Sequence, residues 1–144
     1  RTPTLEHMYN TFPDMNGEYF PSEAWDMEPW WRNFFENTAL VQFNHRTLGM
    51  STAAWISGML AYARSPAIWP MLTRSSRLAL GAVAGVAAVQ VSLGITAILY
   101  YVPVEVGSLH QTGALVLWTS SLFLAHSLRG ASRAANVLRR SRLV

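Results

Sequence analysis

An uncharged run from Leu78 to Val102 constrains the fold of this chain more than any other feature. The run has 25 residues, LALGAVAGVAAVQVSLGITAILYYV. At about 1.5 Å per residue, a helix of this length exceeds the hydrocarbon core of a bilayer, which is about 30 Å thick. The run therefore predicts a transmembrane helix.

Two further apolar segments extend this prediction. Val106–Leu128 is uncharged over 23 residues, and Thr38–Ala63 is apolar from Leu48 onward. The early turns of Thr38–Ala63 are more polar and carry Gln42, Asn44, His45 and Arg46. The fold class that we predict is an all-α membrane protein with three transmembrane helices. The alternative is three core helices of a soluble protein, which is disfavoured because a chain of 144 residues cannot cover them with its own polar surface.

The composition excludes several other classes of protein. Charged residues make up 13% of the chain, against roughly 25% in a typical soluble domain. A hydrophobic content of 51% excludes intrinsic disorder. The chain has no cysteine, which excludes a disulfide scaffold and a cysteine-ligated zinc or iron–sulfur site.

The charges divide the chain in two and predict its orientation. Residues 1–36 hold seven of the eight acidic residues, whereas nine of the eleven arginines follow them. Arginines lie after the first apolar segment (Arg64, Arg74, Arg77) and after the third (Arg129, Arg133, Arg139, Arg140, Arg142). The positive-inside rule places both groups in the cytoplasm or matrix, and residues 1–36 on the outer side. Because these arginines flank apolar runs and form no stripe, we expect membrane lipid as a partner and no nucleic acid.

These patterns predict three regions. Residues 1–36 form an extramembrane loop whose aromatic residues lie at the membrane interface, with a short amphipathic helix around Ser22–Phe35. Residues 37–129 form the membrane region, and residues 130–144 form a basic inner-side tail that extends the third helix. The chain begins with Arg1, so we expect a processed chain or a fragment, and we see no signal peptide. The interfacial aromatic residues are Trp25, Trp30, Trp31, Phe34 and Phe35.

Two histidines enter the predicted membrane region from the same side. By helical rise, His45 lies about 10 Å deep and His110 roughly 5 Å deep, and a helix tilt of about 20° absorbs the difference. The two imidazoles can therefore face each other in the outer leaflet. His126 lies nineteen residues past Gly107, about 28 Å along the third helix by rise, and cannot join them. His7 lies outside the membrane, and the sequence indicates no role for it.

Two imidazoles without a nearby cysteine or carboxylate suit a haem iron with two axial ligands. A non-haem metal would need further ligands, which the three helices do not offer. We therefore predict His45 and His110 as the metal-binding and cofactor-binding residues, and we assign no catalytic residue. Histidines packed and hydrogen-bonded between helices are the alternative. Arg46 would bind either a haem propionate or the lipid headgroups.

Small residues surround the two histidines in the sequence. Gly49, Gly113 and Ala114 lie one turn below them, where a flat macrocycle could approach the backbone. Close packing of helices explains small residues equally well, and we assign that role to Gly81, Gly85 and Gly94.

Four segments resemble haem A synthase, a family of the mitochondrial inner membrane and the bacterial plasma membrane. They are YNTFPDMNG (Tyr9–Gly17), FFENTALVQFNHR (Phe34–Arg46), QVSLGITAILYYVP (Gln90–Pro103) and LHQTGAL (Leu109–Leu115). They occur in the order of the family and spread over most of the chain. The segment ending in QFNHR is the most diagnostic.

The resemblance implies an eight-helix protein of two pseudo-symmetric four-helix bundles, of which this chain is the C-terminal part with the last three helices. In the family that half holds haem B between two histidines, which correspond to His45 and His110. The reaction implied is the conversion of haem O to haem A, in which a methyl group is oxidised to formyl with water as the oxygen source. The haem O substrate would bind in the N-terminal half, and haem A serves cytochrome c oxidase assembly. A haem O synthase and a second copy of the chain are the protein partners that we expect.

One position departs from the motif of the catalytic half. That half has Glu-x-x-His-Arg, whereas here Gln42 lies three residues before His45. The chain therefore resembles the electron-handling half, and we expect it to be inactive alone. A b-type membrane cytochrome subunit that only transfers electrons is the alternative function, and a haem-free assembly factor is another. We predict the mitochondrial inner membrane as the location, with the bacterial plasma membrane as the alternative.

Overall fold

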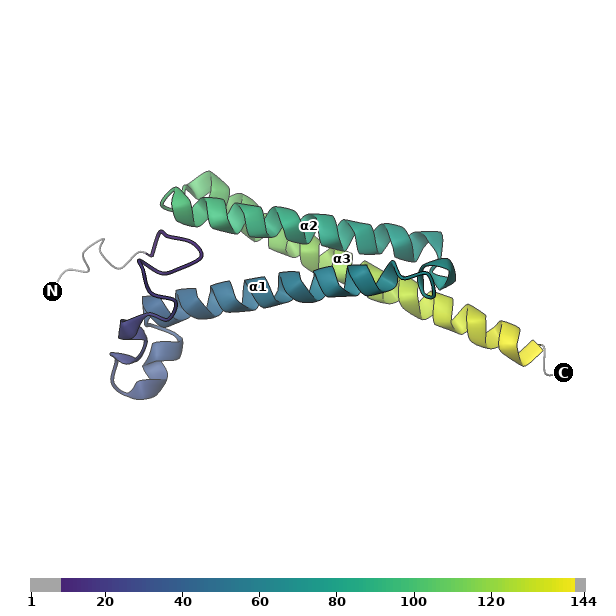
Figure 1. Cartoon of the computed structure of the whole chain (residues 1–144), viewed down its shortest axis with the longest axis horizontal. Helices are drawn as coiled ribbons and strands as arrows, with labels where there is room; N and C mark the ends of the chain where they lie inside the picture. The colour runs from purple at the N-terminus through teal and green to yellow at the C-terminus, as the bar shows by residue number, and fades with distance from the viewer. Residues whose placement is uncertain (1–8, 142–144) are drawn as a thin grey trace. The chain divides into compact units, whose positions relative to one another are not determined.

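A computed structural model describes residues 9–141, with side chains described for residues 9–129. Three α-helices dominate this part of the chain: α1 (Thr38–Ala63), α2 (Arg74–Leu99) and α3 (Val104–Ser141) (Figure 1). Three short 3-10 helices accompany them: η2 (Ser22–Trp25), η3 (Trp30–Phe34) and η4 (Trp69–Met71). Residues 9–141 contain no β-strand beyond one isolated bridge between Met15 and Glu18. The all-α prediction is confirmed.

The chain divides into two compact units. Unit 1 comprises Arg1–Thr52 and Val91–His110, and unit 2 comprises Ala53–Gln90 and Gln111–Val144. Each α-helix contributes residues to both units. Both predicted ligands, His45 and His110, belong to unit 1.

In unit 1, a tight turn shapes the segment before η2. Met15 and Glu18 exchange two backbone hydrogen bonds, with N–O distances of 2.7 and 3.2 Å. Asn16 and Gly17 between them have φ angles of 56° and 92°, the left-handed conformations that this residue pair adopts readily. The turn directs Met15, which is 2% exposed, into a small apolar cluster with Tyr9 and Ala39.

The region around Ser22–Phe35 is not one amphipathic helix, so that prediction is wrong. The structure has two short 3-10 helices, η2 and η3, separated by Asp26–Pro29. Pro29 explains the break, because it has no N–H to donate and it restricts Glu28 to extended conformations. The aromatic side chains of this region remain exposed, and Trp30 is 65% exposed.

Asn37 starts helix α1. Its Oδ1 accepts hydrogen bonds from the backbone N–H groups of Ala39 and Leu40, at 3.0 and 3.2 Å. Its Nδ2 donates to the carbonyl of Glu23 at 2.7 Å and to Oδ1 of Asn33 at 3.0 Å. Asn37 therefore caps the helix and also ties it to the preceding segment.

A short connection joins the end of α2 to the start of α3 within unit 1. It comprises residues 100–103, and Tyr101 and Val102 have φ angles of 59° and 53°. The N–H of Val102 donates to the carbonyl of Ala97 at 2.7 Å, and Pro103 precedes the first turn of α3. Because the connection is short, residues at similar distances from it lie at similar levels on the two helices. By helical rise, Gly94 and His110 both lie roughly 8 Å from it.

In unit 2, an apolar core joins the three α-helices. Buried side chains come from α1 (Ala63), α2 (Ala79, Leu80, Val83) and α3 (Leu124). Ile56, Leu60, Leu72 and Leu117 pack against them. At the start of α2, Oγ1 of Thr73 accepts the N–H of Ser76 at 3.1 Å and thereby caps the helix.

Among the described residues, α2 is the one helix long and apolar enough to cross a membrane by length and composition. In its most apolar window, 22% of the residues are buried, whereas a core helix of a soluble protein is mostly buried. The first and third helices are also present, but their crossing of a membrane stays a prediction. The polar residues near His45 and His110 lower the hydropathy of α1 and α3.

The predicted helix bounds agree closely with the structure. The first segment matches α1 at both ends, while α2 begins and ends a few residues before the predicted Leu78–Val102. Helix α3 extends the predicted Val106–Leu128 in both directions and continues to Ser141. The backbone of the basic tail is therefore helical as far as Ser141, as predicted.

Candidate functional site

His45 and His110 lie next to each other in unit 1. Their ring centroids are 6.0 Å apart, and the ring planes make an angle of 76°. His45 is exposed on α1, and His110 is half-buried on α3. The two residues are 65 positions apart in the chain, so the packing of α1 and α3 brings them together.

This spacing suits one metal ion between the two rings. A metal-bound imidazole nitrogen lies about 2 Å from the ion and the ring centre roughly 1 Å further, so two rings on one iron lie about 6 Å apart. The observed separation is 6.0 Å. Rotation about the nitrogen–metal line leaves the angle between the planes free, so 76° is compatible. The separation of the two ring centroids is therefore compatible with two imidazoles on one iron.

The described residues offer few other ligands for a metal. No group of three or more His, Asp or Glu side chains that could hold a metal ion occurs among them. His126 is exposed on α3 and belongs to unit 2, whereas His7 lies outside the described residues. His45 and His110 are thus the two imidazoles that the described residues bring together.

The ring of His110 packs closely against α2. Its Nδ1 is buried and has no hydrogen-bond partner within the described part of the chain. Gly94 of α2 faces the ring, and a Cβ atom built there would lie 3.2 Å from Cε1 of His110. The interpretation of Gly94 as a packing glycine is therefore correct, and the residue that it accommodates is His110.

Arg46 binds the loop that precedes η2. Its Nη1 donates to the carbonyl oxygens of Thr11 and Asp14, both at 2.8 Å, and its Nη2 donates to that of Tyr9 at 2.5 Å. The sequence suggested a haem propionate or lipid headgroups as its partner. The structure shows three backbone carbonyls instead, which hold the Tyr9–Asp14 loop against α1.

A second contact fastens the same loop. The hydroxyl of Tyr9 donates a short hydrogen bond to the carboxylate of Glu23. Burial, reinforced by this hydrogen bond and by the negative charge of Glu23, raises the pKa of Tyr9 from 10.0 to about 12. Tyr9 is therefore a neutral donor at physiological pH.

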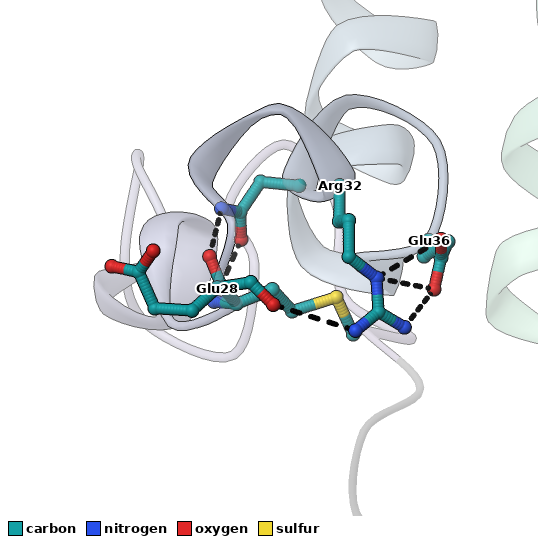
Figure 2. Close-up of polar contacts among 5 residues, drawn as sticks. Glu28, Arg32 and Glu36 are labelled. Carbon is teal, nitrogen blue, oxygen red and sulfur yellow. Dashed lines mark hydrogen bonds and ion pairs between the residues drawn. The ribbon is translucent and has the colours of Figure 1, made fainter.

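Glu36 forms an ion pair with Arg32 at the surface. The guanidinium of Arg32 donates from Nε to both carboxylate oxygens at 3.1 Å and makes a further short contact through Nη2 (Figure 2). The hydrogen bond to Arg32 lowers the pKa of Glu36. Nη1 of Arg32 also donates to the carbonyl of Glu28 at 3.4 Å. Glu36 therefore pairs with Arg32 on the segment just before α1.

The other glycines differ in what they accommodate. In unit 2, a Cβ at Gly113 would lie 1.8 Å from Nε2 of Gln90, so the amide of Gln90 occupies that space. Gly113 therefore accommodates a side chain of α2 and offers no room for a macrocycle. At Gly49, Gly81 and Gly85, a Cβ atom would have no described atom within 4 Å, so the packing role predicted for Gly81 and Gly85 is not seen.

Sequence reasoning missed Gln90 as part of this arrangement. Its side chain is 8% exposed, and its Nε2 has no hydrogen-bond partner among the described residues. The available signal was a polar residue in the middle of the most apolar run, because a buried amide in a membrane helix is costly without a partner.

The chain is similar in sequence to known proteins named heme A synthase. The chain is 44% identical over 124 residues to Heme A synthase COX15 of Arabidopsis thaliana, which covers 86% of this chain and 26% of that protein. It is 41% identical over 121 residues to Heme A synthase of Nitrosospira multiformis, covering 84% and 33%. For Heme A synthase COX15 of Homo sapiens the identity is 36% over 122 residues, covering 85% and 29%. The chain thus spans about a quarter to a third of the length of these relatives.

No solved structure matches the chain. The family model COX15-CtaA, described as cytochrome oxidase assembly protein, matches residues 4–122. This range contains His45, His110 and the Tyr9–Asp14 loop that Arg46 binds. Because the match covers most of the sequence, the chain belongs to the COX15-CtaA family of cytochrome oxidase assembly proteins.

Proposed function

We propose that this chain holds a haem B between His45 and His110 and forms the electron-handling part of a haem A synthase. The observation that carries the proposal is the pair of imidazoles, 6.0 Å apart in unit 1. The names of the relatives support the activity, and the small donor set supports the cofactor. Bound haem supplies one-electron transfer through its iron.

The residues of this chain bind and orient the cofactor. His45 and His110 would hold the haem iron, while Arg46 keeps the Tyr9–Asp14 loop next to the helix turn that carries His45. Gln42 provides no carboxylate for acid–base chemistry. Oxidation of the haem O substrate would therefore use residues of the N-terminal half of an eight-helix protein.

The overall reaction converts a methyl group of haem O to a formyl group. It takes one water molecule and releases four electrons and four protons, so an electron acceptor is required. We propose that the electrons leave through the part of the protein described by this chain. A haem held by His45 and His110 would be able to pass these electrons on one at a time.

We propose the mitochondrial inner membrane as the location, with the bacterial plasma membrane as the alternative. In this topology residues 1–36 lie on the outer side, and the exposed Trp25, Trp30 and Trp31 lie at the headgroup level. The connection from Arg64 to Arg77 and the basic tail lie in the matrix or cytoplasm.

Haem ligation is tested by His45→Ala and His110→Ala in the protein expressed from its complete coding sequence and purified in detergent. Each variant should lose the low-spin absorption of the haem held by this pair, with roughly tenfold or greater loss of haem retention. His126→Ala is the matched control, because His126 is an exposed histidine of α3 in unit 2. Unchanged spectra in both single variants would exclude this site.

Electron transfer without haem A synthesis is the second candidate function. Gln42 favours it, because the chain lacks the carboxylate that the catalytic motif carries at this position. The two functions are separated by supplying haem O to the purified protein and measuring haem A by mass spectrometry. Haem A formation supports the synthase, whereas reversible reduction of bound haem without haem A supports the cytochrome.

A further inference from the structure

We propose that Gly94 is a positioning residue that seats the imidazole of His110. The proposal rests on the function proposed above, in which His110 is an axial ligand. It assigns to the backbone of α2 the task of setting how the ring of His110 is turned toward His45.

The contact between Gly94 and His110 is too close for a side chain at position 94 unless the ring gives way. A Cβ at Gly94 would lie 3.2 Å from Cε1, 3.7 Å from Nδ1 and 3.8 Å from Nε2 of His110. Cε1, which lies between the two nitrogens, is therefore the ring atom nearest to position 94. Any side chain at position 94 must displace or rotate the ring.

The contact is specific to this glycine within α2. Gly81 and Gly85 belong to the same helix, and no atom lies within 4 Å of a Cβ built at either of them. Because glycine is a poor helix former, a glycine in mid-helix is favoured where a close neighbour requires it. Of the three glycines in α2, only Gly94 meets that requirement in the described part of the chain.

The packing contact with Gly94 takes the place of the hydrogen bond that usually orients a metal-binding histidine. A metal-binding imidazole commonly donates its second N–H to a carboxylate or carbonyl, which fixes the ring orientation. Nδ1 of His110 has no hydrogen-bond partner among the described residues and is buried. Steric contact with Gly94 is thus a restraint that the described residues place on this ring.

The orientation of the ring has a measurable consequence. The planes of His45 and His110 cross at 76°, and the electronic structure of a low-spin ferric haem depends on the angle between its two axial imidazole planes. A methyl group at position 94 forces the ring of His110 to turn or shift by a few tenths of an ångström. The g-values of the ferric haem should therefore move, even if the haem stays bound.

The test compares Gly94→Ala and Gly94→Val with Gly85→Ala in the purified, haem-loaded protein. Gly94→Ala should keep the haem and shift its low-spin electron paramagnetic resonance signal, whereas Gly94→Val should weaken haem retention by about tenfold. Gly85→Ala, in open space on the same helix, should match the unsubstituted protein. Unchanged signals and retention in both Gly94 variants would overturn the proposal.

A second measurement separates this proposal from the proposed function. If the unsubstituted protein binds no low-spin haem at His45 and His110, the proposed function fails, and the contact is then tested in haem-free protein. Gly94→Ala should lower the melting temperature by about 3 °C, and His110→Ala should remove that loss. The proposed contact would be overturned if Gly94→Ala lowered the melting temperature equally in the His110→Ala protein. It would also be overturned if Gly94→Ala lowered the melting temperature in neither protein.

Discussion

At the scale of single residues, the chemistry of the side chain decides what the Tyr9–Asp14 loop does. Arg46 reaches three carbonyl oxygens because a guanidinium carries five N–H donors in a planar fork. A lysine ammonium has three donors on one nitrogen and cannot span the same carbonyls with that geometry. The loop therefore depends on arginine and not only on positive charge.

Arg46→Lys should loosen the loop without removing the charge. A hydrogen bond to a charged group contributes about 1.5–3 kcal/mol, so amide hydrogen exchange at Met15 and Asn16 should accelerate by at least about tenfold. Arg64→Lys, at an exposed position beyond α1, is the control and should change neither amide. Unaltered exchange in Arg46→Lys would show that the loop is held by the apolar cluster alone.

The phenol of Tyr9 makes a prediction about alkaline pH. Its folded-state pKa is raised from 10.0 to about 12, so folding favours the protonated phenol. The stabilisation is complete below pH 10 and is lost as the pH rises through about 12. Phenolate absorption should show one tyrosine titrating late, and Tyr9→Phe should remove that step. Titration of all tyrosines near pH 10 would contradict the buried contact with Glu23.

At the scale of elements, helix starts are determined locally while the segment between them is not. Asn37 has the side chain that caps α1, and Thr73 has the one that caps α2. The hydrophobic and aromatic pattern of Ser22–Phe35 suggested one helix, but Pro29 interrupts it. A single proline thus decided the structure where the periodicity alone was misleading.

Asn37→Ala should destabilise unit 1 through the start of α1. The lost cap costs about 1 kcal/mol, and the lost Nδ2 donor leaves the carbonyl of Glu23 without this hydrogen bond. Asn37→Asp retains the capping oxygen and lacks the donor, so its loss should be smaller. Thermal unfolding followed by circular dichroism measures both. An equal loss in the two variants would mean that the cap contributes little.

At the scale of the whole molecule, the distribution of charge predicts how the chain crosses a membrane. Acidic residues gather before α1, whereas arginines gather between α1 and α2 and in the tail. Two basic segments separated by a pair of helices must share a side if all three helices cross. The described side chains also leave many large apolar residues exposed, for example Trp55 and Trp118. Such exposure suits lipid or protein neighbours.

The topology can be tested with introduced thiols because the chain has no cysteine of its own. Tyr19→Cys and Ser75→Cys are matched exposed positions, one before α1 and one at the start of α2. A membrane-impermeant thiol reagent should label Tyr19→Cys from the outer side and Ser75→Cys only after permeabilisation. Labelling of both from one side would contradict three crossings.

Much of this arrangement is predictable because its causes are local. Apolar runs predict helices of nearly the right length, and similar depths on tilted helices predict that His45 and His110 approach each other. The contacts of Arg46 and Gly94 were not predictable in the same way. Their partners, the carbonyls of Tyr9, Thr11 and Asp14 and the ring of His110, are 16 or more residues away in the chain.

Apolar runs and charge are read directly along the chain, so the amino-acid order alone specifies three helices, their bounds to within a few residues at most ends, and the family to which the chain belongs. Which side chain fills a given space depends instead on how helices and loops pack. Packing turned Arg46 toward the loop, placed Gln90 against Gly113, and set the ring of His110 against Gly94, because close contact between distant segments exists only once they are folded together.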